Sequence, residues 1–294
     1  MAEKSRSGGL RRTLFVVRRL FSLLLLIPCV IPLFGQPAGN GEVAPAMAGQ
    51  ALVERALANE LNAAEDASHP MRYQLRKTSP RQSTTKEILE TKDGEVARLI
   101  TVNDQPLSPD AETNEEARLN ALLGDPGKQR RRKQAEDEDA GRALNVLRAL
   151  PSAFLYQDAG PADGPTGKVE KFTFRPNPKF AAMNLETEVL PAMSGEIWID
   201  SVYVRVTRLE GHLQQDVDFG WGILGRLNKG GWIVIEQADV GEGQWRTVRF
   251  KMQISGRVVF KNRVFNTTEE QTHYAPLQEG LTYQKAVETL LSGK

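Results

Sequence analysis

The sequence predicts an α+β protein, mainly β, in which an antiparallel sheet is covered by helices. Two observations carry this prediction. Residues 195–274 read as consecutive antiparallel strands with glycine-bearing turns at 210–211, 229–231, 241–243 and 255–257. Segments before and after this region instead repeat apolar residues with helical spacing. Because strand patterns lie on both sides of the central helical block, we expect one sheet interrupted by a helical insertion.

The strands of this region differ in how their two faces are made. Residues 248–254 alternate, with apolar side chains on one face and Arg, Lys and Gln on the other. Residues 197–199 and 232–235 are apolar on both faces. A strand with two apolar faces needs cover on both sides. Either the protein's own chain or a bound apolar ligand supplies the second cover, and the sequence leaves both options open.

The N-terminus has the pattern of an export signal. Two Arg-Arg pairs precede residues 20–34, an uncharged apolar run that is shorter than the ~20 residues of a membrane-spanning helix. We therefore predict residues 1–36 to be a cleaved signal, with an uncleaved membrane anchor as the alternative. A lipoprotein signal at Cys29 fits less well, because Pro28 stands where a small residue belongs.

Removal of residues 1–36 would change the charge of the chain. The full sequence has a formal net charge of +1, and the signal holds six Lys/Arg and one Asp/Glu, so the rest of the chain carries −4. A mildly acidic protein has no general attraction for nucleic acid, and we expect no nucleic-acid partner. Cys29 is the single cysteine, so the processed chain has no disulfide or thiolate site.

The first elements after the signal read as a helix followed by strands. An apolar stripe over residues 52–64 predicts a helix. Alternation over 71–76 predicts a strand. Lys92-Asp93-Gly94 predicts the turn of a hairpin between strands at 84–91 and 96–102.

The centre of the chain is predicted to be a helical insertion at about residues 108–150. A Ser-Pro start predicts a helix over 108–123, and a second helix covers 128–150 and ends before Pro151. The basic start of the second helix is followed directly by an acidic run, which favours solvated ion pairs over a nucleic-acid site. Its last turns carry an apolar face made of Ala143, Val146, Leu147 and Leu150.

The remaining segments complete the predicted organisation. Residues 37–49, which contain several Pro and Gly, form a flexible leader, and residues 50–294 form a single domain. Residues 158–167 are predicted to be a loop before a strand at 169–175. The apolar spacing in 283–291 predicts a terminal helix.

The sequence offers no plausible catalytic set, and we predict that the protein is not an enzyme and needs no metal or cofactor. The three histidines lie far apart, and no nucleophile elbow or phosphate-binding loop is present. Asp216 and Asp218 are interpreted as an exposed polar strand face. Glu236 interrupts an apolar strand and either points outward or supplies a polar group to a cavity. Hydrolase activity around these three carboxylates is the weakest hypothesis.

Large apolar side chains are the candidates for a binding site. They either fill an ordinary core or line a cavity that holds a lipid-like ligand. An acyl chain is a sufficient ligand without any catalytic polar group, because burial of its methylene groups drives binding. The cavity candidates are Trp198, Phe219, Trp221, Trp232, Phe250 and Met252.

A set of short stretches carries a family resemblance. They are residues 195–200, 217–226, 230–231, Trp245 and 256–261. Together they resemble divergent members of the outer-membrane lipoprotein-sorting (LolA/LolB-like) superfamily in diderm bacteria. This resemblance implies a half-open antiparallel barrel, a helical lid and an apolar interior that shields acyl chains in the periplasm. The helical insertion departs from a compact carrier, and no arginine of this chain is assigned the functional role that the family gives one.

We therefore expect an exported periplasmic binding protein that carries or sorts lipid or lipoprotein acyl chains in an apolar cavity. Envelope membrane proteins are further candidate partners. The alternative is an envelope interaction or assembly protein with a filled core, tethered by the apolar run at 20–34.

Overall fold

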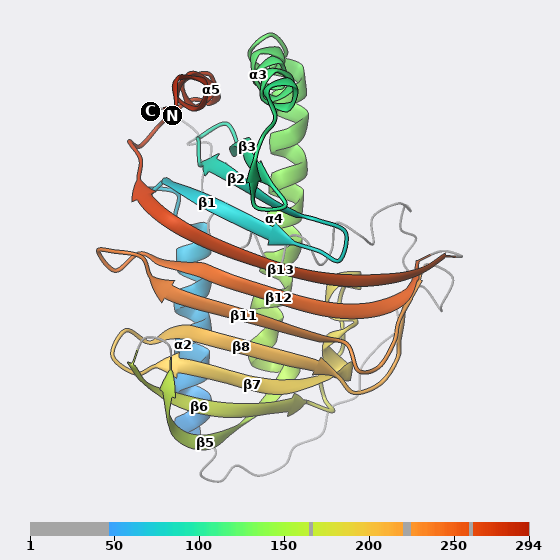
Figure 1. Ribbon diagram of the computed structural model, residues 1–294. Coiled ribbons are helices and arrows are strands. Elements are labelled where there is room, and N and C mark those ends of the chain that lie inside the picture. The colour runs from blue at the N-terminus through green and yellow to red at the C-terminus, as the bar shows by residue number, and fades with distance from the viewer. Residues whose placement is uncertain (1–46, 165–166, 220–224, 259–260, 294) are drawn as a thin grey trace, which may run out of the picture.

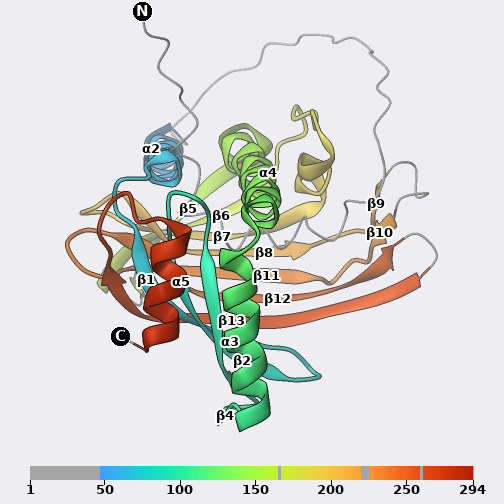
Figure 2. The ribbon, with the colours of Figure 1, turned by 90° about the horizontal axis from the view of Figure 1, so that it is seen from above.

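A computed structural model describes residues 47–164, 167–219, 225–258 and 261–293. It shows a 13-stranded antiparallel sheet that is curved and covered by helices on its concave face (Figures 1 and 2). The predicted fold class, mainly β with helices over a curved antiparallel sheet, is confirmed. The predicted signal at 1–36 lies outside the described residues.

Within the described residues the chain forms the following elements. The strands are β1 (Met71–Thr78), β2 (Ser83–Leu89), β3 (Val96–Val102), β4 (Gln105–Pro106), β5 (Phe154–Gly164), β6 (Gly167–Pro176), β7 (Met193–Asp200), β8 (Arg205–Leu213), β9 (Val217–Phe219), β10 (Gly225–Leu227), β11 (Trp232–Asp239), β12 (Trp245–Val258) and β13 (Lys261–Pro276). The helices are α2 (Met47–Glu65), α3 (Pro109–Leu123), α4 (Pro126–Ala153) and α5 (Tyr283–Ser292), with 3-10 turns η1 (Leu185–Thr187) and η2 (Leu190–Ala192).

The sheet joins strands from both parts of the chain. Its order is β4-β3-β2-β1-β13-β12-β11-β8-β7-β6-β5, and β10 and β9 extend from β12. β1 pairs with β13, so the early strands continue the sheet that the late strands build. α3 and α4 lie between β4 and β5 in the chain. α3 packs with α5 near β3, and α4 runs with α2 across the concave face (Figure 2).

The N-terminal elements follow the predicted pattern closely. The apolar stripe of α2 is buried at Val53, Ala56, Leu57 and Ala64. The helix begins at Met47, so residues 47–49 are helical and not part of a flexible leader. β2 and β3 pair as the expected hairpin, whose turn holds Gly94 at a φ of +112°.

In the helical insertion, the predicted start of α3 is confirmed and the predicted end of α4 is wrong. The Ser108 side chain caps α3 by accepting a hydrogen bond from the Ala111 amide at 3.3 Å. α4 does not end before Pro151, as predicted, but continues to Ala153. Proline lacks an N–H, and in the last turn this removes a single helical hydrogen bond. The carbonyl of Leu150 is satisfied by the Tyr156 hydroxyl at 3.0 Å.

Three segments predicted to be loop or turn lie in strands instead. Residues 158–164 belong to β5, the last strand on one side of the sheet order, where an irregularity after Asp158 accommodates Gly160 and Pro161. Gly211 lies inside β8 and Gly256 inside β12. The turns expected at 229–231 and 241–243 are present, each with glycine at positive φ.

Gly195 and Gly211 are directly opposed on β7 and β8 and serve close packing. A Cβ on Gly195 would lie 1.8 Å from the backbone oxygen of Glu210 and 2.9 Å from the Phe174 ring. A Cβ on Gly211 would lie 2.5 Å from the end of the Met193 side chain. The two glycines therefore leave room for Phe174 and Met193 above the sheet, which is why turn-like residues occur in the middle of strands.

The strands with two apolar faces are covered differently on each side. Ile197 and Ile199 point to the concave face and are fully buried in the core. Trp198 points to the convex face, where Lys171 Nζ lies 5.6 Å and the Arg208 guanidinium 5.5 Å from the centre of its ring. The neighbouring cations and their aliphatic stems thus cover the convex side of Trp198.

A row of alternating charges crosses the convex face. Its members oppose one another directly on β8, β11, β12, β13 and β1. They are Arg208, Glu236, Arg249, Glu270 and Arg76, and the row ends on Asp104. Glu236 accepts from Arg208 and, at 2.9 Å, from Arg249, so this carboxylate points outward. Opposite charges on facing strand positions each contribute roughly 0.2–1 kcal/mol, and together they favour one register.

The close approach at Gly195 predicts a large effect of a single methyl group. Gly195→Ala should lower the free energy of unfolding by about 2 kcal/mol or more, because the clash is with backbone rather than with a movable side chain. Urea unfolding monitored by circular dichroism measures this change.

The matched control is Gly141→Ala in α4, where an added Cβ meets nothing within 4 Å. This change should stabilise the protein by up to about 1 kcal/mol. Equal stability of the two variants would contradict the packing role of Gly195.

Candidate binding cavity

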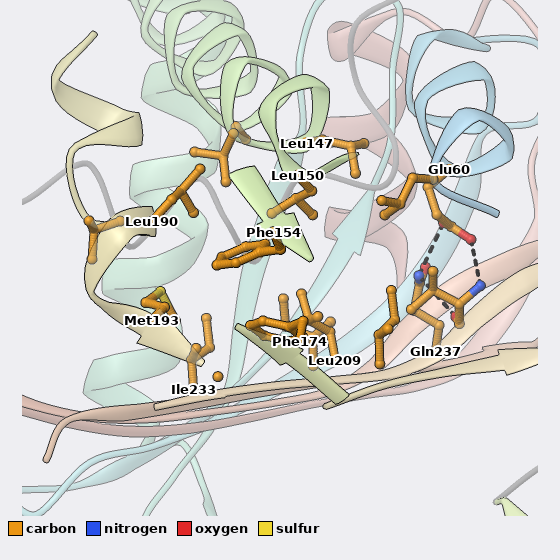
Figure 3. Close-up of a pocket in the computed structure, with 18 of the residues that line it drawn as sticks. Glu60, Leu147, Leu150, Phe154, Phe174, Leu190, Met193, Leu209, Ile233 and Gln237 are labelled. Carbon is orange, nitrogen blue, oxygen red and sulfur yellow. Dashed lines mark hydrogen bonds between the residues drawn. The ribbon is translucent and has the colours of Figure 1, made fainter. Parts of the chain in front are cut away.

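An apolar cavity of about 140 Å³ lies between the concave face of the sheet and helices α2 and α4 (Figure 3). Its wall is almost entirely aliphatic and aromatic, with a few polar side chains at one end. Concave apolar sites with a small number of placed polar groups are typical of sites for small apolar ligands.

The sheet side of the cavity is built by residues that face one another across strands. Ile197 on β7, Leu209 on β8 and Ile235 on β11 are directly opposed. Ile233 lies two residues before Ile235 and therefore on the same face. Gly211 opposes Ile233 and also lines the cavity. The space above this glycine holds the end of the Met193 side chain, which also lines the cavity.

A bulge adds a second residue of β8 to the wall. Trp198 pairs with Arg208, whereas the next residue, Ile199, pairs with Val206. The extra residue, Thr207, resets the alternation of the strand. Val206 and Leu209, three residues apart, consequently both line the cavity.

The opposite side of the cavity is formed by helices. The four residues predicted to form the apolar face of the second central helix, Ala143, Val146, Leu147 and Leu150, all line the cavity from α4. α2 adds Leu57. The two helices meet through a cluster of small and aliphatic side chains that includes Ala64, Ala140 and Leu144.

The polar end of the cavity is organised around Glu60 of α2, whose side chain is 4% exposed. Its carboxylate accepts from Arg205 Nε at 2.8 Å and Nη2 at 2.9 Å, and from the Val206 amide at 3.0 Å. Gln237 Nε2 donates to the same carboxylate at 3.1 Å (Figure 3). Glu60 therefore fixes α2 to β8 and β11 at once.

The loop beside this cluster is held by further contacts. The Arg205 guanidinium lies 5.8 Å from the centre of the Trp245 ring. The ring of Tyr203 also packs against Trp245, with the two ring centres 5.8 Å apart. Val204 has a φ of +52°, which a β-branched residue rarely adopts, and Asn59 of α2 donates to its carbonyl at 3.0 Å. α2 thus holds a strained connection between β7 and β8 in place.

Tyr156 is a second polar group in the wall. Its hydroxyl donates to the Leu150 carbonyl at 3.0 Å. Burial, and then the charge of Glu54, raise the pKa of this phenol far above its ordinary value. The hydroxyl is therefore neutral at physiological pH and has its proton engaged with the end of α4.

The predicted site residues lie around this cavity in different ways. Trp198 and Trp232 are on the convex side of β7 and β11, and the wall is formed by their neighbours Ile197 and Ile233. Phe250 and Met252 pack against Ile233 on the concave side. Phe219 is buried in the same hydrophobic cluster as much of the wall. Trp221 lies outside the described residues. Ligand contact by any of these six residues stays a prediction.

The positions of the charged residues along β8 and β11 are the sequence signal that identifies the cavity wall, because they mark which face of each strand points outward. Arg208, Glu210 and Glu236 belong to the convex face. Residues one position away, such as Leu209 and Ile235, must then face inward. Side-chain size alone favours the tryptophans instead.

The carboxylates considered for catalysis are all paired with cations. Asp218 forms two hydrogen bonds of 2.7 Å with Arg226, which hold the pKa of this carboxyl below its ordinary value. Asp216 accepts from the Lys229 amide at 2.8 Å and lies 3.6 Å from Arg226. Both aspartates are exposed and pair with Arg226, as expected for an exposed polar face.

Two features are absent from the described residues. No group of three or more His, Cys, Asp and Glu side chains among them is arranged to hold a metal ion. In the same part of the chain, no helix is both long and apolar enough to cross a bilayer.

Comparison with known proteins gave a limited result. No family model matches the chain, and no curated protein matches it. Two solved chains match. One is a domain from Vibrio parahaemolyticus named for a proposed role as an outer membrane lipoprotein-sorting protein. The match covers 81% of this chain and 99% of that domain, with 11% identity and a TM-score of 0.32. At this TM-score the likeness carries no argument about the site.

The Glu60 cluster predicts a strong dependence of stability on one carboxylate. Glu60→Ala should lower the free energy of unfolding by about 3–5 kcal/mol, because it leaves the largely buried Arg205 without its anion. Urea unfolding of the processed chain tests this.

The control is Asp163→Ala, which breaks the exposed pair with Lys168 and should cost less than about 1 kcal/mol. If Glu60→Ala were as mild as this control, Glu60 would not be the group that fixes α2.

Proposed function

We propose that the protein is an exported, non-enzymatic carrier that holds lipid or lipoprotein acyl chains in the cavity between the sheet and helices α2 and α4. The observation that supports this proposal is the apolar wall of the cavity, to which two helices and several strands contribute. The basic and apolar N-terminal pattern supports export, and the residue-level resemblance to the lipoprotein-sorting superfamily supports a periplasmic location.

The size of the cavity limits what it holds in this state. A dry apolar cavity of about 150 Å³ accommodates a ligand the size of benzene. The 140 Å³ found here therefore suits a few methylene groups rather than a whole acyl chain. Each methylene buried contributes about 0.8 kcal/mol, so a partly inserted chain already binds weakly and a longer one binds better if the cavity enlarges.

Enlargement would move α4 rather than α2. α2 is fixed to β8 and β11 through the four hydrogen bonds of Glu60. α4 faces the cavity with aliphatic side chains only, and aliphatic contacts re-form in shifted positions at small cost. Its polar contacts with α2 are a long hydrogen bond of 3.4 Å from Gln50 to the Pro151 carbonyl and an exposed pair between Arg148 and Glu65, which are weaker than the buried Glu60 cluster. We therefore propose α4 as the movable side of the site.

Filling the cavity should abolish binding. Leu147→Trp on α4 places a larger ring in the space that the ligand would occupy, and should weaken binding of a fluorescent fatty-acyl probe at least about tenfold. The measurement is a fluorescence titration of the processed protein, with circular dichroism to establish folding.

The matched control is Leu155→Trp, since Leu155 on β5 is exposed. It should bind the probe as the natural protein does. Unchanged affinity in Leu147→Trp would contradict the assignment of this cavity as the site.

Extraction and mass spectrometry of the purified processed protein test the carrier function directly. We expect a lipid or other acyl compound to co-purify. Absence of any such compound, together with no binding of the probe, would overturn the proposal and favour the alternative of an envelope interaction protein with a filled core.

Fractionation of expressing cells tests the localisation. A protein whose residues 1–36 are removed should appear in the soluble periplasmic fraction, with an N-terminus after the apolar run 20–34. Recovery in the membrane fraction with residues 20–34 intact would support the tethered alternative.

A further inference from the structure

Gln237 lies at the polar end of the cavity with one half of its amide engaged (Figure 3). Its side chain is on the concave face, in line with Ile233 and Ile235, and the residue is 5% exposed. Nε2 donates to Glu60 at 3.1 Å and to the Val206 carbonyl at 3.2 Å. Both partners are acceptors, so the amide orientation is fixed: reversing it would place Oε1 against two oxygens.

The other half of the amide has no partner among the described residues. Gln237 Oε1 is buried and receives no hydrogen bond there. Buried acceptors in folded proteins are rarely left in this state. Because Gln237 lines the cavity, a hydrogen-bond donor on a bound molecule is one way to satisfy it.

The surroundings of Gln237 set the charge that this donor can have. The two oxygens of Glu60 have four acceptor sites, and all four receive a donor, from Arg205 twice, Val206 and Gln237. The charge of Glu60 is balanced by Arg205, which does not belong to the cavity wall. A ligand ammonium would find no unmatched anion, and a ligand carboxylate would face the oxygens of Gln237 and Glu60.

The remaining polar groups of the wall do not change this balance. The Tyr156 hydroxyl donates to the Leu150 carbonyl and is left as an acceptor. Thr247 contributes a hydroxyl, which is uncharged and rotates to suit its partner. A single neutral donor does not compensate for the transfer of an ionised carboxylate into an apolar cavity.

We infer that the cavity selects an apolar chain that ends in an uncharged hydrogen-bond donor, a hydroxyl or an amide N–H, and that Gln237 Oε1 is the group that recognises it. This inference rests on the proposed carrier function and names its ligand class. Free fatty-acid anions are disfavoured ligands of the site, and neutral alcohols or amides are favoured ones.

Three ligands of equal chain length test the inference: decanol, methyl decanoate and decanoate, each displacing an apolar fluorescent probe from the processed protein at about pH 8. Decanol carries the donor, the ester carries neither donor nor charge, and decanoate carries the charge. We expect decanol to bind about tenfold more tightly than the ester, and the ester more tightly than decanoate.

Gln237→Leu removes the acceptor and puts an apolar side chain of similar size in its place. It should weaken decanol binding about tenfold and leave the ester unchanged, so that the preference between them disappears. Gln253→Leu, the same change at an exposed position of β12, is the control and should keep the natural order. If Gln237→Leu does not fold, the order of affinities of the three ligands for the natural protein still tests the proposed selectivity.

The outcomes separate the two proposals. Decanoate binding as tightly as decanol, or an equal loss of alcohol and ester binding in Gln237→Leu, overturns the selectivity and leaves the carrier function standing. Failure of all three ligands to displace a bound probe overturns this inference and leaves the carrier function standing. Failure of the probe to bind, together with the absence of any co-purifying acyl compound, overturns the carrier function and this inference together.

Discussion

The buried carboxylate of Glu60 is the interaction on which the arrangement of helices and sheet depends. A helix laid on a sheet by aliphatic contacts alone can shift by a residue at small cost, because such contacts are not directional. Four hydrogen bonds from Arg205, Val206 and Gln237 give α2 a single position. That position in turn places Leu57 over the sheet and leaves the space beside α4 open. The cavity is thus a consequence of a polar contact.

The convex face imposes the complementary constraint on the sheet. Each strand in the row from Arg208 to Arg76 presents a charge opposite its neighbour's, and a slip by one residue would bury those charges under the helices. The register is therefore fixed from outside as well as by the core. With both α2 and the register fixed, an internal hollow can persist without the sheet collapsing into it.

Much of the fold follows from the sequence, and the exceptions have a physical reason in common. Periodicity predicts α2, the β2–β3 hairpin, α3 and α5, because these elements each bury one regular face. The prediction was wrong where a residue type that usually ends an element is used for a long-range contact. Pro151 remains in α4, where its carbonyl accepts from Gln50 Nε2 of α2 at 3.4 Å and where the loss of one helical hydrogen bond in the last turn is small. Gly211 stays in β8 because Met193 occupies the space of its side chain. Such contacts cannot be read from neighbouring residues.

The residue types in the sequence also do not locate the cavity of the candidate site. Large aromatic residues predict buried surface, yet a hollow exists only where large residues are absent. Trp198 is held between two cations on the convex face, while the wall is made of Ile197, Leu209 and Ile233 with Gly211 beside them. Medium-sized side chains leave volume that a tryptophan would fill. A cavity of this kind is defined by residues whose side chains are too short to fill it. Gln237 is one of them, and its buried Oε1, which receives no hydrogen bond from the described residues, is the group that we propose to recognise the ligand.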